Sequence, residues 1–213
     1  MAMVQVIDWQ SRERFSDVVE QMHRLRKEVF IDFYKWGLSH RDGLEIDQFD
    51  TPEALYLLDC DPKTGTLASS LRLLPTTGLH MMESLFPHLC ANGYPRGDQV
   101  FEISRLFYNP AIQKAGGAAL IRAHHRILLG LVEFSRHAGI QDLIFVTHAK
   151  FMARLISYDW DIRPLGFPAA DGDQQITAMQ LTITAETLPN LQRQFNLFEP
   201  VLQSWPDLAA KAA

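Results

Sequence analysis

The chain has 213 residues, 47% of them hydrophobic and 21% charged, which is typical of one globular domain and excludes a disordered chain. Acidic residues outnumber basic ones by 25 to 20, and this net charge of −5 argues against a nucleic-acid partner. No secretory leader and no apolar run long enough to span a membrane is visible, so we expect a cytoplasmic protein with no membrane partner.

Apolar periodicity predicts the elements of the first half. In chain order they are a strand over 3–9, a helix over 14–35, a loop over 37–53, and strands over 54–59 and 66–74. The helix repeats apolar residues every three or four positions, and Ser11 or Ser16 is its expected N-cap. The segment 61–65, Asp-Pro-Lys-Thr-Gly, predicts a hairpin turn between the two strands.

The second half predicts a longer helix among short strands. In order it contains loops over 75–99 with a short helix near 81–85, a strand over 100–107, a turn at 109–110, a helix over 117–137, a strand over 143–146, a helix over 150–157, strands near 161–165 and 178–184, and a helix from about 186. Gly139 is expected to close the long helix, and the fully apolar run 143–146 predicts a buried central strand. Without a repeat or linker, we expect one mixed α/β domain over residues 1–213.

Cysteine and histidine spacing indicates no metal site. Cys60 and Cys90 have no second cysteine near either, so reduced thiols are favoured, with one disulfide as the alternative. The adjacent His124 and His125 point about 100° apart on a helix, which is poor geometry for shared metal ligation.

The end of the first helix and the loop after it carry the first candidate site. Arg26 offers a guanidinium for a carboxylate, and Phe30 with Trp36 offers an aromatic wall for a flat or cationic ligand. The alternative is an ordinary helix end with packed aromatics. Asp47 and Asp50 either hold a cationic ligand group or pair with Arg26 and Arg72. Calcium is a weak option because the EF-hand spacing is missing.

The strand over 100–107 carries charged residues that need an explanation. Strict alternation places Glu102 and Ser104 on one face, with Phe101 and Arg105 on the other. Glu102 near a dry cleft suits a general base toward an amine, and structural ion pairs are the alternative.

The start of the long helix carries a weak phosphate-binding pattern. Gln113, Gly116, Gly117 and Ala118 match Q-x-x-G-x-A, in which small residues let backbone N–H groups approach a pyrophosphate.

Together these segments resemble the acyl-homoserine lactone synthases, the LuxI-type autoinducer synthases of bacterial quorum sensing. The resemblance runs from about Val4 to Thr184 and is carried by residues 22–30, Trp36, residues 45–50, 71–77, Phe86–Pro87 and residues 102–105. It implies an N-acetyltransferase-like (GNAT-type) α/β fold, a mixed sheet flanked by helices with a central cleft.

The resemblance also implies the reaction. The amine of S-adenosylmethionine, a co-substrate rather than a permanently bound cofactor, attacks an acyl thioester on acyl carrier protein or coenzyme A. The carboxylate then attacks the sulfonium-bearing carbon, which closes a lactone and releases methylthioadenosine.

Residue roles follow from the same resemblance. The catalytic residues are expected to be Glu102, Ser104 and Arg105. Glu102 would be the base and backbone N–H groups beside this strand the oxyanion donors, while Arg105 and Arg72 would hold the loop carboxylates and the cleft in register. The S-adenosylmethionine side would comprise Arg26, Phe30, Trp36, Asp47, Asp50 and Arg72. The acyl-chain pocket would comprise Phe86, Phe101, Phe145, Thr147 and Met152. The carrier or coenzyme A contacts would comprise Gln113, Gly116, Gly117, Ala118, Lys150 and Arg154.

Two details bear on the substrates. Gln113–Ala118 weakly favours coenzyme A, whereas a basic patch at Lys150 and Arg154 would suit an acidic carrier protein. Phe145 falls where some 3-oxo-acyl makers carry a hydroxyl residue, with Thr147 as the alternative position, so we expect an unsubstituted, 3-hydroxy or unusual acyl group.

Two other functions remain open from the sequence. One is an acetyl-CoA-dependent N-acetyltransferase of the same fold, which methylthioadenosine release would exclude. The other is a catalytically silent ligand-binding module, which would bind S-adenosylmethionine without turnover.

Overall fold

The computed structural model describes residues 3–61 and 63–203, which form two compact units. The first unit comprises the described residues up to Arg72, together with Arg105–Gly130 and the residues from Val201. The second comprises Leu73–Ser104 and Leu131–Pro200. Strands β3 (Leu67–Pro75) and β4 (Val100–Tyr108) contribute residues to both.

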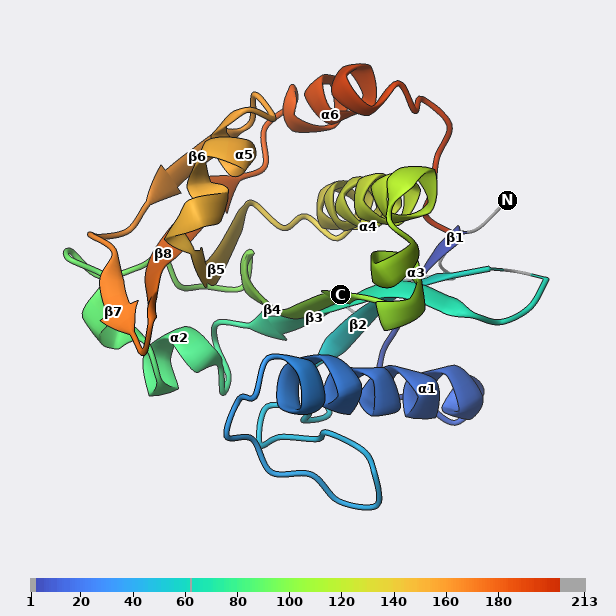
Figure 1. Ribbon diagram of the computed structural model, residues 1–213. Helices are drawn as coiled ribbons and strands as arrows, with labels where there is room; N and C mark the ends of the chain where they lie inside the picture. The colour runs from blue at the N-terminus through green and yellow to red at the C-terminus, as the bar shows by residue number, and fades with distance from the viewer. Residues whose placement is uncertain (1–2, 62, 204–213) are drawn as a thin grey trace. The chain divides into compact units, whose positions relative to one another are not determined.

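The first unit is a sheet with helices packed on it. Its strands are β1 (Met3–Ile7), β2 (Leu55–Cys60) and parts of β3 and β4, in that hydrogen-bonded order, and β1 runs antiparallel to β2. Helix α1 (Ser16–Arg26) lies along one face of β1 and β2 (Figure 1), where its Met22 joins a buried cluster with Ile7 and Tyr56.

The other face of β1 packs on α4 (Gly117–His137) at very short range. A Cβ added at Gly130 would lie 2.8 Å from the side chain of Val4, so only glycine fits here without a shift. The shorter helix α3 (Pro110–Ala115) precedes α4.

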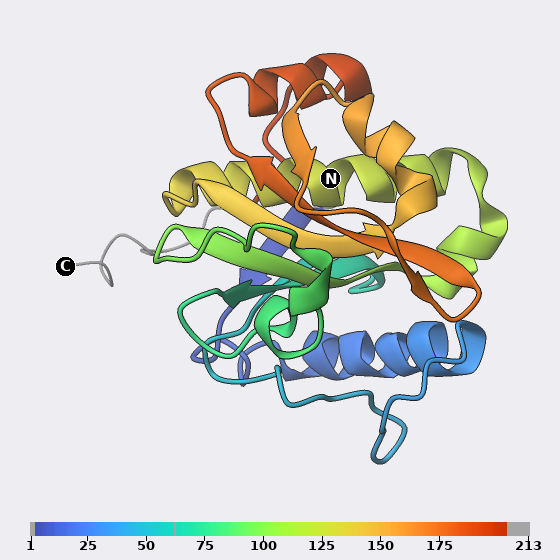
Figure 2. The ribbon, with the colours of Figure 1, turned by 90° about the vertical axis from the view of Figure 1, so that its left-hand side faces the viewer.

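The sheet of the second unit includes the first part of β4. Strand β5 (Asp142–His148) runs parallel to β4, so that β4, α3, α4 and β5 form a β-helix-β crossover. Strand β8 (Gln174–Thr182) is antiparallel to β5 (Figure 2) and also pairs with β6 (Asp161–Pro164) and β7 (Ala169–Asp171). The helices of this unit are α2 (Met81–Ser84), 3-10 turns at Pro87–Leu89 and Ala149–Phe151, α5 (Met152–Ile156) and α6 (Thr187–Phe195).

Most predicted elements are confirmed, including the long helix over residues 117–137 and Gly139 beyond it with φ +71°. The predicted turn at 109–110 is wrong, because the Asn109 side chain accepts a hydrogen bond from the Ala111 N–H and caps α3. Strand β7 was not predicted. The central strand is buried over only part of its length, since Phe145 and Val146 are half-buried.

The start and end of the first helix also differ from expectation. Its N-cap is Phe15, without a side-chain cap, while Ser11 exchanges hydrogen bonds with Asp8 in the preceding turn. The predicted Ser11 and Ser16 caps are therefore wrong. After Arg26 the helix widens into a π-helix, Lys27–Phe33, which periodicity did not reveal.

Strand β4 does not keep strict alternation. Val100 and Glu102 are buried before Ser104, whereas Arg105 and Phe107 are buried after it. Arg105 has φ +51°, a left-handed conformation typical of a β-bulge. The bulge shifts the burial pattern by one residue, so burial along this strand does not follow the strict alternation used in the prediction.

Three further features concern the described residues only. None of their helices is long and apolar enough to cross a membrane. No group of three or more of their His, Cys, Asp and Glu side chains is placed to hold a metal ion. Cys60 is buried and Cys90 is half-buried, and both are free cysteines.

Candidate active site

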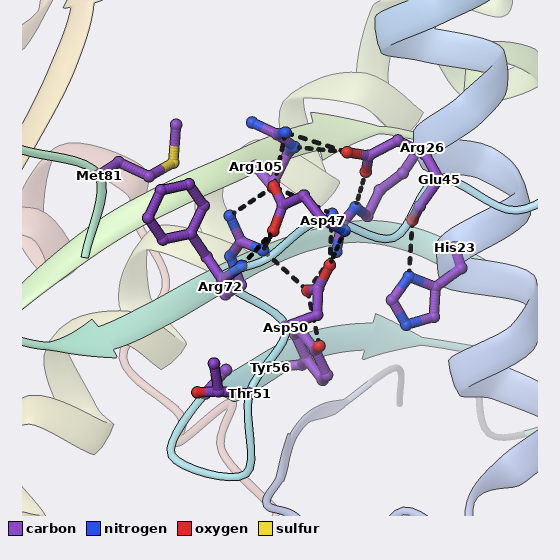
Figure 3. Close-up of polar contacts among 12 residues, drawn as sticks. His23, Arg26, Glu45, Asp47, Asp50, Thr51, Tyr56, Arg72, Met81 and Arg105 are labelled. Atoms are coloured by element: carbon purple, nitrogen blue, oxygen red, sulfur yellow. Dashed lines mark hydrogen bonds and ion pairs between the residues drawn. The ribbon is translucent and has the colours of Figure 1, made fainter. Parts of the chain in front are cut away.

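The first unit holds a buried network of three guanidinium groups and three carboxylates (Figure 3). Its members come from α1, from the loop before β2, from β3 and from β4: Arg26, Glu45, Asp47, Asp50, Arg72 and Arg105. The loop segment 45–50 thus brings three carboxylates to cations that lie far apart in sequence.

Every arginine of the network donates hydrogen bonds to at least two of its carboxylates. Arg26 donates to Glu45 at 2.5 Å and to both oxygens of Asp50 at 2.8 and 3.0 Å. Arg72 donates to Asp47 at 2.6 Å and to Asp50 at 2.8 Å. Arg105 donates to Glu45 at 3.0 Å and to Asp47 at 2.7 Å. Such charge-assisted bonds, several of them forked, fix the loop to the sheet.

The network is electrically balanced and almost dry. Three positive and three negative charges cancel, which makes their burial tolerable because each charge is paired. The side chains of Arg26 and Glu45 are 1% and 0% exposed, whereas that of Asp47 is 16% exposed. Asp47 is therefore the carboxylate of the network that is most open to a ligand.

The network keeps Asp50 and Arg26 ionised. Burial alone would raise the pKa of Asp50, but Arg26 and Arg72 outweigh it and hold this pKa far below its usual range. Burial would likewise lower the pKa of Arg26, yet Asp50 and Glu45 raise it. Burial and the nearby Asp50 raise the pKa of Tyr56, whose hydroxyl donates to Asp50 at 2.8 Å. Tyr56 therefore stays a neutral donor at physiological pH.

Of the two alternatives from the sequence, the structure shows the pairing of Asp47 and Asp50 with arginines. It does not leave the Arg26 guanidinium open to a ligand carboxylate, because its own chain occupies it. Glu45 lies in the segment 45–50 that carries the family resemblance, but the sequence analysis assigns it no role. Glu45 lies two residues before Asp47 in the same acidic loop, and this proximity was the available signal that it shares the arginine partners of Asp47.

The π-helix places an aromatic stack beside the network. Its widened turn carries the backbone N–H of Trp36 to the carbonyl of Phe30, at 2.9 Å. The two rings stack at 5.0 Å between centroids and 24° between planes, and Tyr34 stacks on both. Arg105 lies 5.4 Å over the Phe30 ring, a cation–π distance. Since Trp36 is 39% exposed, part of the stack remains open to a ligand.

The second unit holds Glu102, which is 2% exposed. Its Oε2 accepts a hydrogen bond of 2.5 Å from the backbone N–H of Met81, the first residue of α2. Ser104, two residues further along β4, is half-buried. The carboxylate is thus held by a backbone donor, in apolar surroundings that include Cys90, whose pKa is raised by burial and by Glu102.

The predicted acyl-chain residues divide between two faces of the second unit's sheet. The register pairs Glu102 with Ile144 and Phe101 with Leu143, so Phe101, Phe145 and Thr147 share the face opposite Glu102. Phe86 instead packs in the cluster of Met82, Ile144 and Val146 on the face of Glu102. Met152 begins α5 and is half-buried. The structure therefore groups Phe101, Phe145 and Thr147, but not Phe86.

The predicted donor contacts lie at helix ends. Gln113 belongs to α3. Gly116 and Gly117 have φ of +61° and +58°, and this left-handed backbone separates helix α3 from helix α4. Ala118, in the first turn of α4, is exposed. Lys150 lies in a 3-10 turn and Arg154 in α5, so they do not share one regular helix, although both are exposed.

A family model described as autoinducer synthase matches residues 10–191 of the chain. The chain belongs to this family. A relative from Bradyrhizobium diazoefficiens, isovaleryl-homoserine lactone synthase, is 29% identical over 212 residues, 99% of this chain and 93% of the relative. An acyl-homoserine-lactone synthase from Agrobacterium fabrum is 31% identical over 163 residues, 76% of this chain and 77% of the relative.

Solved structures support the same assignment for the synthase. A CoA-dependent acyl-homoserine lactone synthase, BjaI, solved with SAM and isopentyl-CoA, has a TM-score of 0.87 and 29% identity and covers 100% of this chain and 98% of its own. An N-acetyltransferase-type structure from Lactobacillus plantarum, at 16% identity, 85% coverage of this chain and 99% of its own, has a TM-score of 0.53, which shows the shared fold alone. The synthase is thus an acyltransferase with the expected fold, and the family assignment decides against the plain N-acetyltransferase.

Proposed function

We propose that this synthase transfers an acyl group from an acyl-CoA to the amine of S-adenosylmethionine and then closes the homoserine lactone, releasing methylthioadenosine. The observation that carries the proposal is the likeness, over the whole chain, to a CoA-dependent synthase solved with SAM and isopentyl-CoA. The product would be a quorum-sensing signal.

The charge network and aromatic stack of the first unit suit S-adenosylmethionine. A sulfonium is attracted to the face of an aromatic ring, and Trp36 is exposed enough to offer one. The amine, when protonated, suits Asp47, the most exposed carboxylate of the network. Arg26, Asp50 and Arg72 then act as positioning residues that hold Asp47 and its loop in place.

Glu102 suits the general base. Acyl transfer requires a neutral amine, and a buried carboxylate with one fixed backbone donor can accept the proton that the amine loses. The tetrahedral oxyanion then needs hydrogen-bond donors, for which backbone N–H groups near the bulge of β4 are the candidates, with Ser104 beside them. The lactone forms when the substrate carboxylate displaces the sulfur and the carbon–sulfur bond breaks.

Coenzyme A suits the first turn of α4. The paired glycines free the backbone before this helix, and a Cβ at either would meet nothing within 4 Å, so an anion can approach the N–H groups there. We therefore favour acyl-CoA over acyl carrier protein as the donor. The exposed Lys150 and Arg154 would suit an acidic carrier protein, so both donors belong in the assay.

The acyl group is proposed to lack a 3-oxo substituent. Phe145 presents no hydrogen-bonding group, and Thr147, two residues along the same face of β5, is the nearest hydroxyl on that strand. An unsubstituted, branched or 3-hydroxy chain fits this composition, and the mass of the product identifies it.

We further propose that the chain is one folding domain that works in the cytoplasm, where both substrates occur. Because β3 and β4 contribute to both compact units, neither unit has a complete sheet of its own. A single calorimetric unfolding transition supports one domain, and two separate transitions contradict it.

The decisive experiment incubates the purified synthase with S-adenosylmethionine and a panel of acyl-CoA and acyl-carrier thioesters. Mass spectrometry is expected to find methylthioadenosine and a lactone in equal amounts. The Glu102→Gln variant should lose acyl transfer, while the control Glu53→Gln, at an exposed carboxylate, should keep it. Thiol release without methylthioadenosine would overturn the synthase reaction.

A paired substitution tests the donor. A glutamate at Ala118 is favourable to the N-terminus of α4 but repels a phosphate, so Ala118→Glu should keep its melting temperature and raise KM for acyl-CoA about tenfold or more. The neutral Ala118→Gln should leave KM unchanged. An unchanged KM in both variants would place the coenzyme A elsewhere.

A further inference from the structure

A buried histidine of the second unit has no role in the mechanism above. His80 directly precedes α2 and is 0% exposed. Its Nδ1 lies 2.9 Å from the carbonyl oxygen of Gly78. A carbonyl only accepts hydrogen bonds, so Nδ1 carries a proton, and in the neutral ring Nε2 then carries a lone pair. This Nε2 is buried and has no hydrogen-bond partner among the described residues.

His80 lies close to Glu102 through two separate connections. The next residue, Met81, donates its backbone N–H to Glu102 at 2.5 Å. The His80 ring also meets the Tyr94 ring edge-on at 5.6 Å, and Tyr94 has its pKa raised by burial and then by carboxylates that include Glu83 and Glu102. A basic nitrogen without a partner is thus placed in the surroundings of the proposed base.

The same ring faces a route to solvent. Its Nδ1 lies 3.7 Å from Oε2 of Glu83, whose side chain is 48% exposed. The other Glu83 oxygen binds the equally exposed Arg96 at 2.9 Å. The charged and titratable groups near His80 are the exposed Glu83 and Arg96, the half-buried Tyr94 against its ring, and Glu102 and Cys90, which both act on Tyr94.

The proposed reaction has a proton to dispose of. An ammonium that becomes an amide nitrogen loses two protons, of which one ends on the released thiol. The other must leave Glu102, and at 2% exposure this carboxylate is closed to bulk water. A buried base that is used at every turnover needs a partner that takes its proton onward.

We propose that His80 is this partner and relays the proton from Glu102 to solvent. The carboxylic O–H bond of Glu102 breaks and an N–H bond forms at Nε2 of His80 by way of a water molecule. The imidazolium then gives its Nδ1 proton to Glu83, which passes it to water. Exchange with water, in which Nε2 loses one proton and Nδ1 gains one, restores the starting tautomer. This inference rests on the proposed function, since it needs Glu102 as the base.

The test uses His80→Asn in the full chain. The asparagine amide can keep the hydrogen bond to Gly78 but offers no basic nitrogen. We expect kcat to fall by about 10²-fold, the low end of general acid–base effects, with KM for both substrates unchanged. The solvent deuterium isotope effect on kcat should rise, because proton removal becomes rate-limiting. The control His88→Asn changes an exposed histidine and should behave as wild type.

Three outcomes separate the relay from its alternatives. A folded His80→Asn with wild-type kcat overturns the relay. A lower kcat without a larger isotope effect, matched by a lower melting temperature, assigns His80 a structural role and also overturns it. A second variant, His80→Gln, also lacks a basic nitrogen but differs from asparagine in side-chain length. It should show the same lower kcat and larger isotope effect if His80 relays the proton. Full acyl transfer by Glu102→Gln would instead refute the role of Glu102 as the base. A wild-type kcat in His80→Asn would refute the relay alone and leave the role of Glu102 unaffected.

Discussion

Replacing Asp50 with asparagine removes one charge from the buried network and keeps the shape of the side chain. Asp50 accepts hydrogen bonds from Arg26 and Arg72, from the Tyr56 hydroxyl and from the Asp47 backbone N–H. Its side chain is 2% exposed, so water cannot compensate for the lost charge. The balance of three positive and three negative charges becomes an excess of one positive charge.

Breaking a buried ion pair by removing one partner costs about 3–5 kcal/mol, and we expect Asp50→Asn to lower the free energy of unfolding by this amount at pH 7. Urea denaturation measures the change. The control Asp32→Asn breaks an exposed pair with Lys27, whose side chains are 27% and 47% exposed, and should cost less than about 1 kcal/mol.

The pH dependence gives a second check with a definite sign. Because the folded-state pKa of Asp50 is lowered, its contribution to stability is complete above its unfolded value of 3.8 and is lost as the pH falls further. The variant lacks this contribution, so the difference between the two proteins should stay constant from pH 7 down to the region of the unfolded pKa of 3.8 and shrink below it. A difference under about 1 kcal/mol at pH 7, or one independent of pH, would refute the argument from the network.

Three other predictions concern single positions. Gly166→Ala places a Cβ 2.3 Å from the carbonyl oxygen of Leu89, and the shift it forces should cost about 1–3 kcal/mol or more in urea denaturation; an unchanged midpoint would contradict this close contact. Burial raises the pKa of the Cys60 thiol to about 12, so a thiol reagent at pH 8 should label Cys60 only after unfolding, and fast labelling of the native protein would show that the site opens. Trp36→Ala should weaken S-adenosylmethionine binding, measured by calorimetry, while the melting temperature changes little because the ring is 39% exposed; the exposed Trp9→Ala serves as the control.

The fold was largely predictable because its main elements repeat apolar residues over many turns. The helix over residues 117–137 kept its predicted bounds, since a long amphipathic stripe followed by Gly139 leaves few alternatives. The π-helix was not predictable, because one extra residue in a turn changes periodicity too little to be seen over seven residues. Strand β7, with three residues, is too short to alternate visibly.

The candidate site was predictable in composition and less so in geometry. Charged residues within an apolar strand indicated that Glu102 and Arg105 needed partners, and the structure shows partners for both. The ion pair between Arg26 and Glu45 could not be predicted from their separation in the sequence, because the two residues meet only through tertiary folding. Phe86 and Phe145 lie on opposite faces of the second unit's sheet, and this too depends on the strand register, which the sequence does not reveal.

The bulge at Arg105 also limits how this synthase can be recombined with its relatives. Before the bulge the even-numbered side chains of β4 are buried, and after it the odd-numbered ones are. Deleting one residue here, or joining the strand to a donor sequence without the bulge, would turn every later side chain over and expose Arg105 and Phe107. Chimeras should therefore exchange β4 whole, with crossover points outside Val100–Tyr108.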